Sequence, residues 1–284
     1  HDGPLFHDDL AAINAPVWFH EFVAHATRHG LAWLADAGSD AFGSRALPAE
    51  ILEMLRSLDR ITREQYRDFF LCRRFRRSLV VGRDTLAAAK EDPRALDVLR
   101  LSCFAARSEA EGGEVRYAQR SGATLRTRDR RVSGIMDALV GAWPGTLGME
   151  EVLALAGAHF KPAETAAERL RFARGVLVEA LGLGVVNAAA EPPELASRPG
   201  PSPRASLLAR RQLVQGAEVT NLWRETVALD DAFAARLLPL LDGTRSRERL
   251  ALELRDAWNG PPGELAAAIE RHLEHIARLA LLHG

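Results

Sequence analysis

Residues 14–37 read NAPVWFHEFVAHATRHGLAWLADA. Asn14 offers a capping side chain, and the ring of Pro16 fixes the φ angle that suits a first helical turn. At about 100° per residue, one arc roughly 120° wide collects the apolar and small residues. These are Phe19, Phe22, Val23, Ala26, Gly30, Trp33, Leu34 and Ala37. The stretch therefore predicts one long amphipathic helix that carries three aromatic rings into a core.

The opposite face of this helix carries Glu21, His25 and His29, whose side chains are common metal ligands. His20 and Glu21 followed by His25 look like a zinc-protease helix, but that motif needs histidines at i and i+4 on one face. His20 and His25 point about 140° apart around the helix. Since the sequence offers no Cys/His cluster as a second half, we predict a solvated or domain-facing polar stripe and no metal site.

The composition is that of an ordinary soluble globular protein, with 47% hydrophobic and 26% charged residues. The 284 residues suffice for about two or three domains. A formal net charge of −1 gives no overall attraction to nucleic acid or to an anionic membrane. No apolar run approaches the ~20 residues that span a bilayer, and no signal peptide is seen, so we predict a cytoplasmic protein without membrane insertion. The first residue is not Met, so we expect a fragment of a longer protein.

The two cysteines, Cys72 and Cys103, have neither the number nor the spacing of a metal site or a disulfide framework. Each lies among apolar residues in the sequence. We therefore predict that both are small core residues in a reducing compartment.

Residues 1–128 are predicted to form helices and a small mixed or antiparallel sheet. A capping-box pattern at 62–65 opens a helix that carries Tyr66, Phe69 and Phe70 inward. The hydrophobic period then changes to two, which indicates strands. The alternating stretches are 75–81, 99–105, 115–118 and 124–127.

Residues 129–190 contain three helical stretches and then a strand, which is the order of a winged helix; an arbitrary helical bundle explains the pattern equally well. Residues 191–203 are dense in proline and predict a linker that neither pairs in a sheet nor continues a helix. Residues 204–284 contain further helical stretches and a strand at 219–229, an order that is compatible with a second winged-helix-like unit. The predicted fold class is α+β, predominantly helical, with two winged-helix-like units after the N-terminal one.

Several motifs belong to one family pattern. They are His7-Asp8-Asp9-Leu10, Asn14 with Pro16, Phe19-His20-Glu21-Phe22, His25-Ala26, His29-Gly30-Leu31, Glu64-Gln65-Tyr66-Arg67-Asp68-Phe69 and Phe75-Arg76-Arg77-Ser78-Leu79. Together they resemble the predicted methyltransferase regulatory domain, which follows a Rossmann-like catalytic domain in a group of bacterial S-adenosylmethionine-dependent methyltransferases. A later block resembles the winged-helix-like C-terminal domain of the same enzymes. It comprises Leu208-Ala209-Arg210, Val219-Thr220-Asn221-Leu222, Leu237-Leu238 and Leu241-Asp242-Gly243-Thr244.

The resemblance implies a non-catalytic regulatory or substrate-docking region of such a methyltransferase, and some relatives are protein lysine methyltransferases acting on bacterial outer-membrane proteins. A class I methyltransferase site needs a glycine-rich turn after its first strand and an acidic residue after its second, and this sequence has neither. We therefore expect no catalytic residue, cofactor or metal in this chain, and S-adenosylmethionine in a catalytic domain that lies before residue 1. The fragment alone is expected not to be an enzyme.

The expected partners are the catalytic domain of the parent chain, a protein substrate and a second copy of the chain. Seven residues are candidates for such docking interfaces. They are His7, His20, Glu21, His25, His29, Arg76 and Asn221.

Arginine clusters at 73–77, 126–131 and 210–211 leave two other functions open, a tandem winged-helix nucleic-acid-binding module and a structural dimerisation module. The helix at 163–181 mixes glutamates with its arginines, which disfavours nucleic acid. Because Arg76 alternates with apolar residues, we predict that its side chain lies on the outer face of a strand, available to a partner's carboxylate.

Overall fold

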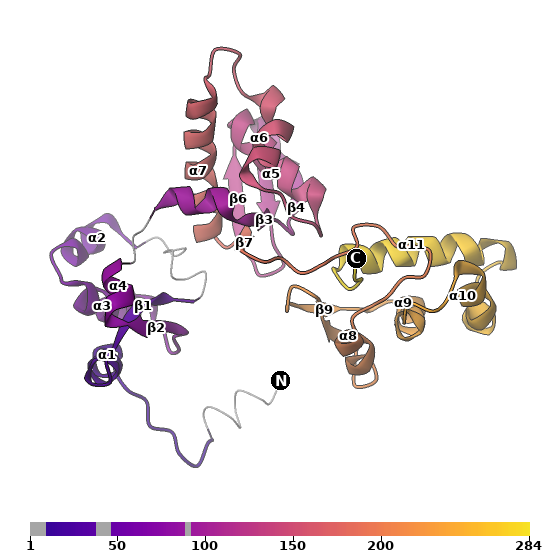
Figure 1. Ribbon diagram of the computed structural model, residues 1–284, viewed down its shortest axis with the longest axis horizontal. Helices are drawn as coiled ribbons and strands as arrows, with labels where there is room; N and C mark the ends of the chain where they lie inside the picture. The colour runs from indigo at the N-terminus through magenta and orange to yellow at the C-terminus, as the bar shows by residue number, and fades with distance from the viewer. Residues whose placement is uncertain (1–9, 38–46, 89–91) are drawn as a thin grey trace. The chain divides into compact units, whose positions relative to one another are not determined.

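The computed structural model describes residues 10–37, 47–88 and 92–284, so the prediction made for His7 lies outside the described residues (Figure 1). Contacts divide the chain into two compact units, residues 1–92 and 93–284. The predicted α+β class is confirmed, with many helices and small antiparallel sheets. Within the described residues, no helix is both long and apolar enough to cross a membrane.

The N-terminal unit is a two-stranded antiparallel sheet with short helices. Its elements are α1 (Phe19–Arg28), β1 (Leu31–Asp36), α2 (Ala49–Arg56), α3 (Arg60–Leu71), β2 (Ser78–Gly82) and α4 (Arg83–Ala88). β1 pairs with β2, and Trp33 of β1 lies opposite Val80. α3 begins where the carboxylate of Asp59 accepts the N–H groups of Ile61 and Thr62.

The prediction of one long helix over 14–37 is wrong. α1 begins only at Phe19, where Glu21 accepts the N–H of Trp18, and it ends at Arg28. Gly30 then takes a φ of +75°, a conformation that glycine adopts without steric cost, and the chain turns directly into β1. The helical wheel nevertheless grouped two rings that do meet, because Trp33 packs edge-on against Phe19 across this turn at 5.1 Å.

The first half of the C-terminal unit, residues 93–190, has one core built from strands and helices. Its strands are β3 (Arg100–Ser102), β4 (Ala106–Ala110), β5 (Glu114–Ala118), β6 (Thr124–Thr127) and β7 (Asn187–Ala189). Its α-helices are α5 (Arg130–Ala142), α6 (Met149–Leu155) and α7 (Ala166–Gly182). β3 pairs with β7 and also bridges Leu147, while β4, β5 and β6 form a separate antiparallel sheet. Side chains of β3, β5 and β6 share a core with α5–α7.

The second half, residues 191–284, has its own core. Its elements are α8 (Leu207–Gln212), β8 (Glu218–Thr220), β9 (Thr226–Ala228), α9 (Ala232–Leu237), α10 (Arg247–Leu254) and α11 (Leu265–Arg278). The strand predicted at 219–229 is therefore a hairpin of β8 and β9. The expectation that 191–203 makes no strand pairing is wrong at one place, because Leu195 bridges His283.

The two halves repeat one topology. In each, a short extended segment pairs with a residue shortly before the next-to-last α-helix and with the chain after the last one. The first half uses β3 with Leu147 and β7, and the second half joins Arg204 to Asp242 and Ala205 to Leu282. Three helices followed by an extended segment, which end each half, are the order predicted for a winged helix. How far the segments 1–128, 129–190 and 204–284 fold as independent domains remains a prediction.

The last helix of each half also ends in the same way. Gly184 follows α7 with a φ of +71°, and Ala280 follows α11 with a φ of +58°. The next N–H reaches back into the helix in both, from Val185 to the carbonyl of Ala180 and from Leu281 to the carbonyl of Ile276. The equivalent cap supports a repeated unit.

Aromatic side chains connect the two halves. Trp143 stacks on Phe104 with ring centroids 4.8 Å apart and on Trp223 at 6.2 Å. The indole N–H of Trp143 donates to the carbonyl of Arg278 at 2.7 Å, and that of Trp223 donates to the carbonyl of Pro144 at 3.3 Å. Both polar ends of the stacked indoles are therefore satisfied across the junction.

The cysteine prediction is right for one residue only. Cys103 is fully buried, and burial raises the pKa of its thiol to about 12. Cys72 is exposed and caps α3 with a left-handed φ of +49°. It is therefore not a core residue.

Gly134 on α5 provides a test of the helix packing. A Cβ at this position would lie 2.6 Å from ring atoms of His159, so Gly134→Ala should lower the free energy of unfolding by about 1–3 kcal/mol. At Gly175 on α7 a Cβ would meet no atom within 4 Å, so Gly175→Ala should instead stabilise by about 0.5–1 kcal/mol through helix propensity. Urea unfolding of both variants measures the difference. Equal effects of the same sign would contradict the packing at Gly134.

Candidate functional site

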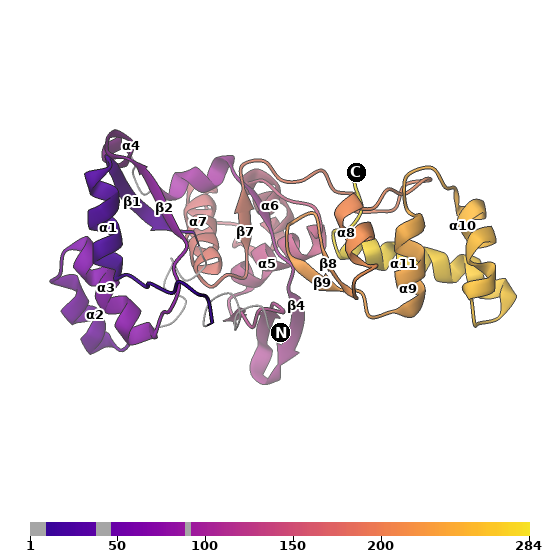
Figure 2. The ribbon, with the colours of Figure 1, turned by 90° about the horizontal axis from the view of Figure 1, so that it is seen from below.

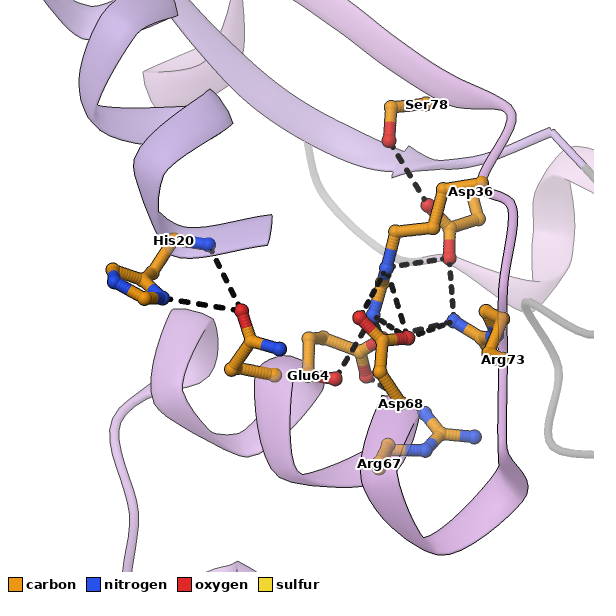
Figure 3. A network of polar contacts seen from close by, with 9 residues as sticks. His20, Asp36, Glu64, Arg67, Asp68, Arg73 and Ser78 are labelled. Carbon is orange, nitrogen blue, oxygen red and sulfur yellow. Dashed lines mark hydrogen bonds and ion pairs between the residues drawn. The ribbon is translucent and has the colours of Figure 1, made fainter. Parts of the chain in front are cut away.

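The densest charge cluster of the N-terminal unit lies between its sheet and α3 (Figure 3). Asp36 ends β1, and Glu64 and Asp68 share one face of α3 because they are one helical turn apart. Arg73 and Arg76 lie on the connection from α3 to β2. These five side chains are only 8–12% exposed, so the cluster is largely shielded from water.

The guanidinium of Arg76 contacts all three carboxylates. Its Nη1 lies 2.7 Å from Asp36 Oδ2, its Nε 2.9 Å from Asp68 Oδ2, and its Nη2 3.2 Å from Glu64 Oε2. Its carbon Cζ lies 3.9 Å from the centre of the Phe19 ring, a cation–π contact. Burial lowers the pKa of Arg76, but hydrogen bonding and charge from Asp68, Asp36 and Glu64 outweigh it and raise that pKa overall.

Further contacts complete the cluster. Arg73 Nη1 donates to Asp36 Oδ2 at 3.0 Å, and Arg67 pairs with Glu64 at 2.8 Å. The hydroxyl of Ser78 donates to Asp36 Oδ1 at 3.3 Å. Three guanidinium groups thus face three carboxylates, and the cluster joins β1, α3 and β2. We interpret the cluster as a structural ion network. Losing any one partner would leave an uncompensated charge in a place shielded from water, which destabilises the fold.

The predicted position of Arg76 on the outer face of a strand is wrong. Arg76 precedes β2, its side chain is 11% exposed, and its N–H groups point to carboxylates of its own unit. Sequence alternation missed this because it describes one strand only, whereas the partners lie on α3 and at the end of β1. A part for Arg76 in an interface stays a prediction.

Two other candidates on α1 have local roles. The backbone N–H of His20 and its ring Nδ1 both donate to Oε1 of Gln65, at 3.2 and 3.1 Å. Gln65 is buried on α3, so these bonds hold α1 against α3. Glu21 accepts the N–H of Trp18 at 3.0 Å and so caps α1. Both residues therefore help to set the position of α1.

His25 and His29 are exposed on α1 and its C-terminal cap, with ring centroids 4.8 Å apart. Arg28 donates to Nδ1 of His25 at 3.3 Å. Among residues 10–37, 47–88 and 92–284, no group of three or more His, Cys, Asp or Glu side chains could hold a metal ion.

Asn221 lies in the other unit, at the turn between β8 and β9. Its side chain is buried, and its Oδ1 accepts the N–H of Glu225 at 2.9 Å, which closes the turn. Its Nδ2 has no hydrogen-bond partner among the described residues. The structure gives Asn221 a turn-forming role, and docking by this residue stays a prediction.

Aromatic rings of the N-terminal unit lie on its surface where the sequence pattern predicted a core. Tyr66, Phe69 and Phe70 were expected to point inward from α3, yet they are 43%, 51% and 40% exposed. The carboxylates and Gln65 occupy the inward face of α3 instead. Trp18 packs edge-on against Phe69 at 5.5 Å, and Phe75 is 65% exposed. Exposed aromatic groups are common at interaction sites, and we call these five residues the aromatic surface.

Both ends of the chain match known families. Residues 1–82 match the family described as predicted methyltransferase regulatory domain, and residues 202–281 match the PKMT, C-terminal winged helix domain. The family resemblance seen in the sequence is therefore confirmed at both ends.

Individual relatives come from Rickettsia. The uncharacterized protein RP789 of Rickettsia prowazekii is 39% identical over 84 residues, which are 29% of this chain and 15% of that protein. Two structures of PKMT2 from Rickettsia typhi, one of them in complex with AdoHcy, share the fold with TM-scores of 0.81 and 18% identity. They align with all of this chain, which spans 61% and 62% of their own length.

The ion network predicts a large effect of one arginine. Arg76→Met keeps the length of the side chain but leaves three carboxylates with only Arg67 and Arg73 as partners, so the free energy of unfolding should fall by about 3–5 kcal/mol. Arg77→Met removes the same charge from an exposed neighbour and should change it by less than about 0.5 kcal/mol. Thermal and urea unfolding of the two variants test this. Equal stability of both variants would show that the network does not hold this unit together.

Proposed function

We propose that this chain is the non-catalytic regulatory and substrate-docking region of a bacterial, cytoplasmic, S-adenosylmethionine-dependent methyltransferase that acts on a protein. The observation that carries the proposal is that both matched families are parts of methyltransferases. The likeness to PKMT2 adds support through the fold. Since the chain spans about three fifths of PKMT2, we take the catalytic domain to be a further part of the same protein.

The described residues do not fit S-adenosylmethionine themselves. Every strand pairing in the described part of the chain is antiparallel, whereas a nucleotide-type cofactor site uses a glycine-rich turn after a parallel strand. Gly82 stands alone where β2 runs into α4, and Gly112 with Gly113 joins the antiparallel strands β4 and β5. We therefore assign the cofactor to the catalytic domain and no step of methyl transfer to these residues.

The aromatic surface is our proposed contact with that catalytic domain. Burying half-exposed rings such as Trp18 and Phe69 stabilises a docked complex by removing apolar area from water. The exposed stripe of Glu21, His25 and His29 lies on the same helix that Trp18 caps, and would form its polar rim.

A cofactor titration tests the division of labour. The isolated chain should show no heat of specific binding when titrated with S-adenosylmethionine up to about 1 mM, the upper end of ordinary enzyme affinities. The full-length parent protein, as the control, should bind it with defined stoichiometry. Stoichiometric micromolar binding by the isolated chain would contradict the proposal.

A second test concerns the aromatic surface in the full-length parent protein. Trp18→Ala with Phe69→Ala should lower the rate of methyl transfer to protein by at least about tenfold, because docking residues at the centre of an interface dominate its energy. Leu155→Ala with Leu252→Ala serves as the control, since both leucines are similarly exposed in the other unit. Methyl transfer from radiolabelled cofactor gives the rate, and melting curves verify folding. Equal rates in both double variants would remove the aromatic surface from the interface.

A further inference from the structure

The sheet of β4, β5 and β6 has one buried face and one exposed face. Tyr117 of β5 and Leu125 of β6 are buried on the inner face, and the hydroxyl of Tyr117 donates to Asp137 of α5 at 2.7 Å. Because side chains alternate along a strand, the neighbours of these residues point outward. Figure 2 shows the hairpin of β4 and β5 projecting from the helices of its half.

The strand register places two arginines side by side on the outer face. Arg116 of β5 pairs with Arg126 of β6, and Ser108 of β4 lies on the other side of Arg116. Directly opposite side chains have Cβ atoms about 5 Å apart, so like charges in such a pair destabilise the sheet. Both arginines are exposed, and neither has an ion-pair or hydrogen-bond partner in the described part of the chain.

The arginine on the inner face of the same sheet has carboxylate partners. Arg107 of β4 contacts the carboxylates of Asp137 and Glu109, each at 2.9 Å. On the outer face, Glu114 lies two residues before Arg116 on β5, and its carboxylate is 3.9 Å from Arg128. No carboxylate of the described residues therefore forms an ion pair with Arg116 or Arg126.

The surroundings of the pair leave it accessible to a ligand. The other side chains on the outer face are mainly small, so they do not cover the two guanidinium groups. These small residues are Ala106, Ser108, Ala110, Ala118 and Thr124. Planar guanidinium groups bind carboxylates with two parallel hydrogen bonds, and a carboxylate between two of them relieves their repulsion.

We infer that the outer face of the β4–β5–β6 sheet, centred on Arg116 and Arg126, binds an acidic segment of the protein substrate. The identification of the partner as a substrate rests on the proposed function. A protein is favoured over nucleic acid because acidic side chains interrupt the basic ones: Glu114 lies near Arg116 and Arg128, and the exposed face of α7 mixes Arg171 with Glu168 and Glu179. A duplex binder needs several phosphate contacts along a basic track.

A charge reversal separates binding from folding. Arg126→Glu puts a carboxylate opposite Arg116, so the melting temperature of the 284-residue chain should rise. Its affinity for a fluorescein-labelled oligo-glutamate peptide, measured by anisotropy near 0.15 M salt, should fall at least about tenfold. Arg271→Glu is the matched control, an exposed arginine of α11 without an ion pair among the described residues, and should change the affinity less than about twofold.

Peptide affinity that is unchanged in Arg126→Glu would overturn the inference. Mixed-sequence duplex DNA that binds more tightly than the peptide, and is lost in the same variant, would also overturn it and assign the surface to nucleic acid. Methyl transfer by the full-length protein is measured separately. Its absence in the wild type would sink the proposed function, whereas equal peptide binding by wild type and variant sinks only this inference.

Discussion

The C-terminal unit depends on one topological constraint. In each half, the segments beside the last three helices need an extended segment from earlier in the chain as their pairing partner. β3 meets this need in the first half by pairing with β7 and bridging Leu147. Residues 204–205 meet it in the second half. A strand with neighbours on both sides has its backbone polar groups satisfied, and the core above it can then be dry. Leu101, at the centre of β3, is fully buried for this reason.

This constraint explains why the segments before the last three helices of each half cannot be ordinary linkers. The proline-rich stretch leads into Arg204 and Ala205, and its own Leu195 bridges His283 near the end of the chain. The stack of Trp143 on Trp223 then connects the two repeated halves, with each indole N–H bonded to a carbonyl. A segment whose composition is typical of a linker can thus pair like a strand when a neighbouring segment offers a partner.

Sequence patterns predicted the fold class, the helix order and the family, and they failed where distant partners decide. Hydrophobic period is a local signal, so it located the strands at 115–118 and 124–127 closely. The capping pattern at 62–65 was misplaced, because α3 begins at Arg60 with Asp59 as its cap. Gly30 was placed on a helical face, although its left-handed φ ends the helix. Tyr66, Phe69 and Phe70 were placed inward because apolar residues usually are. In the structure, the carboxylates of α3 point inward because they contact Arg76, which also contacts Asp36. The aromatic rings therefore lie on the surface.

Arginine illustrates how a structure separates scaffold from binding surface when the sequence cannot. Arg76 and Arg116 look alike in the sequence, since each alternates with apolar residues in a strand-like stretch. Arg76 lies among three carboxylates of its own unit, so its charge is satisfied internally. Arg116 is held by register against Arg126, with no carboxylate of the described residues paired with either. A fold gains nothing from an uncompensated repulsion. A partner that supplies negative charge would relieve this repulsion, which is why the unpaired arginines, and not the buried ones, point to binding.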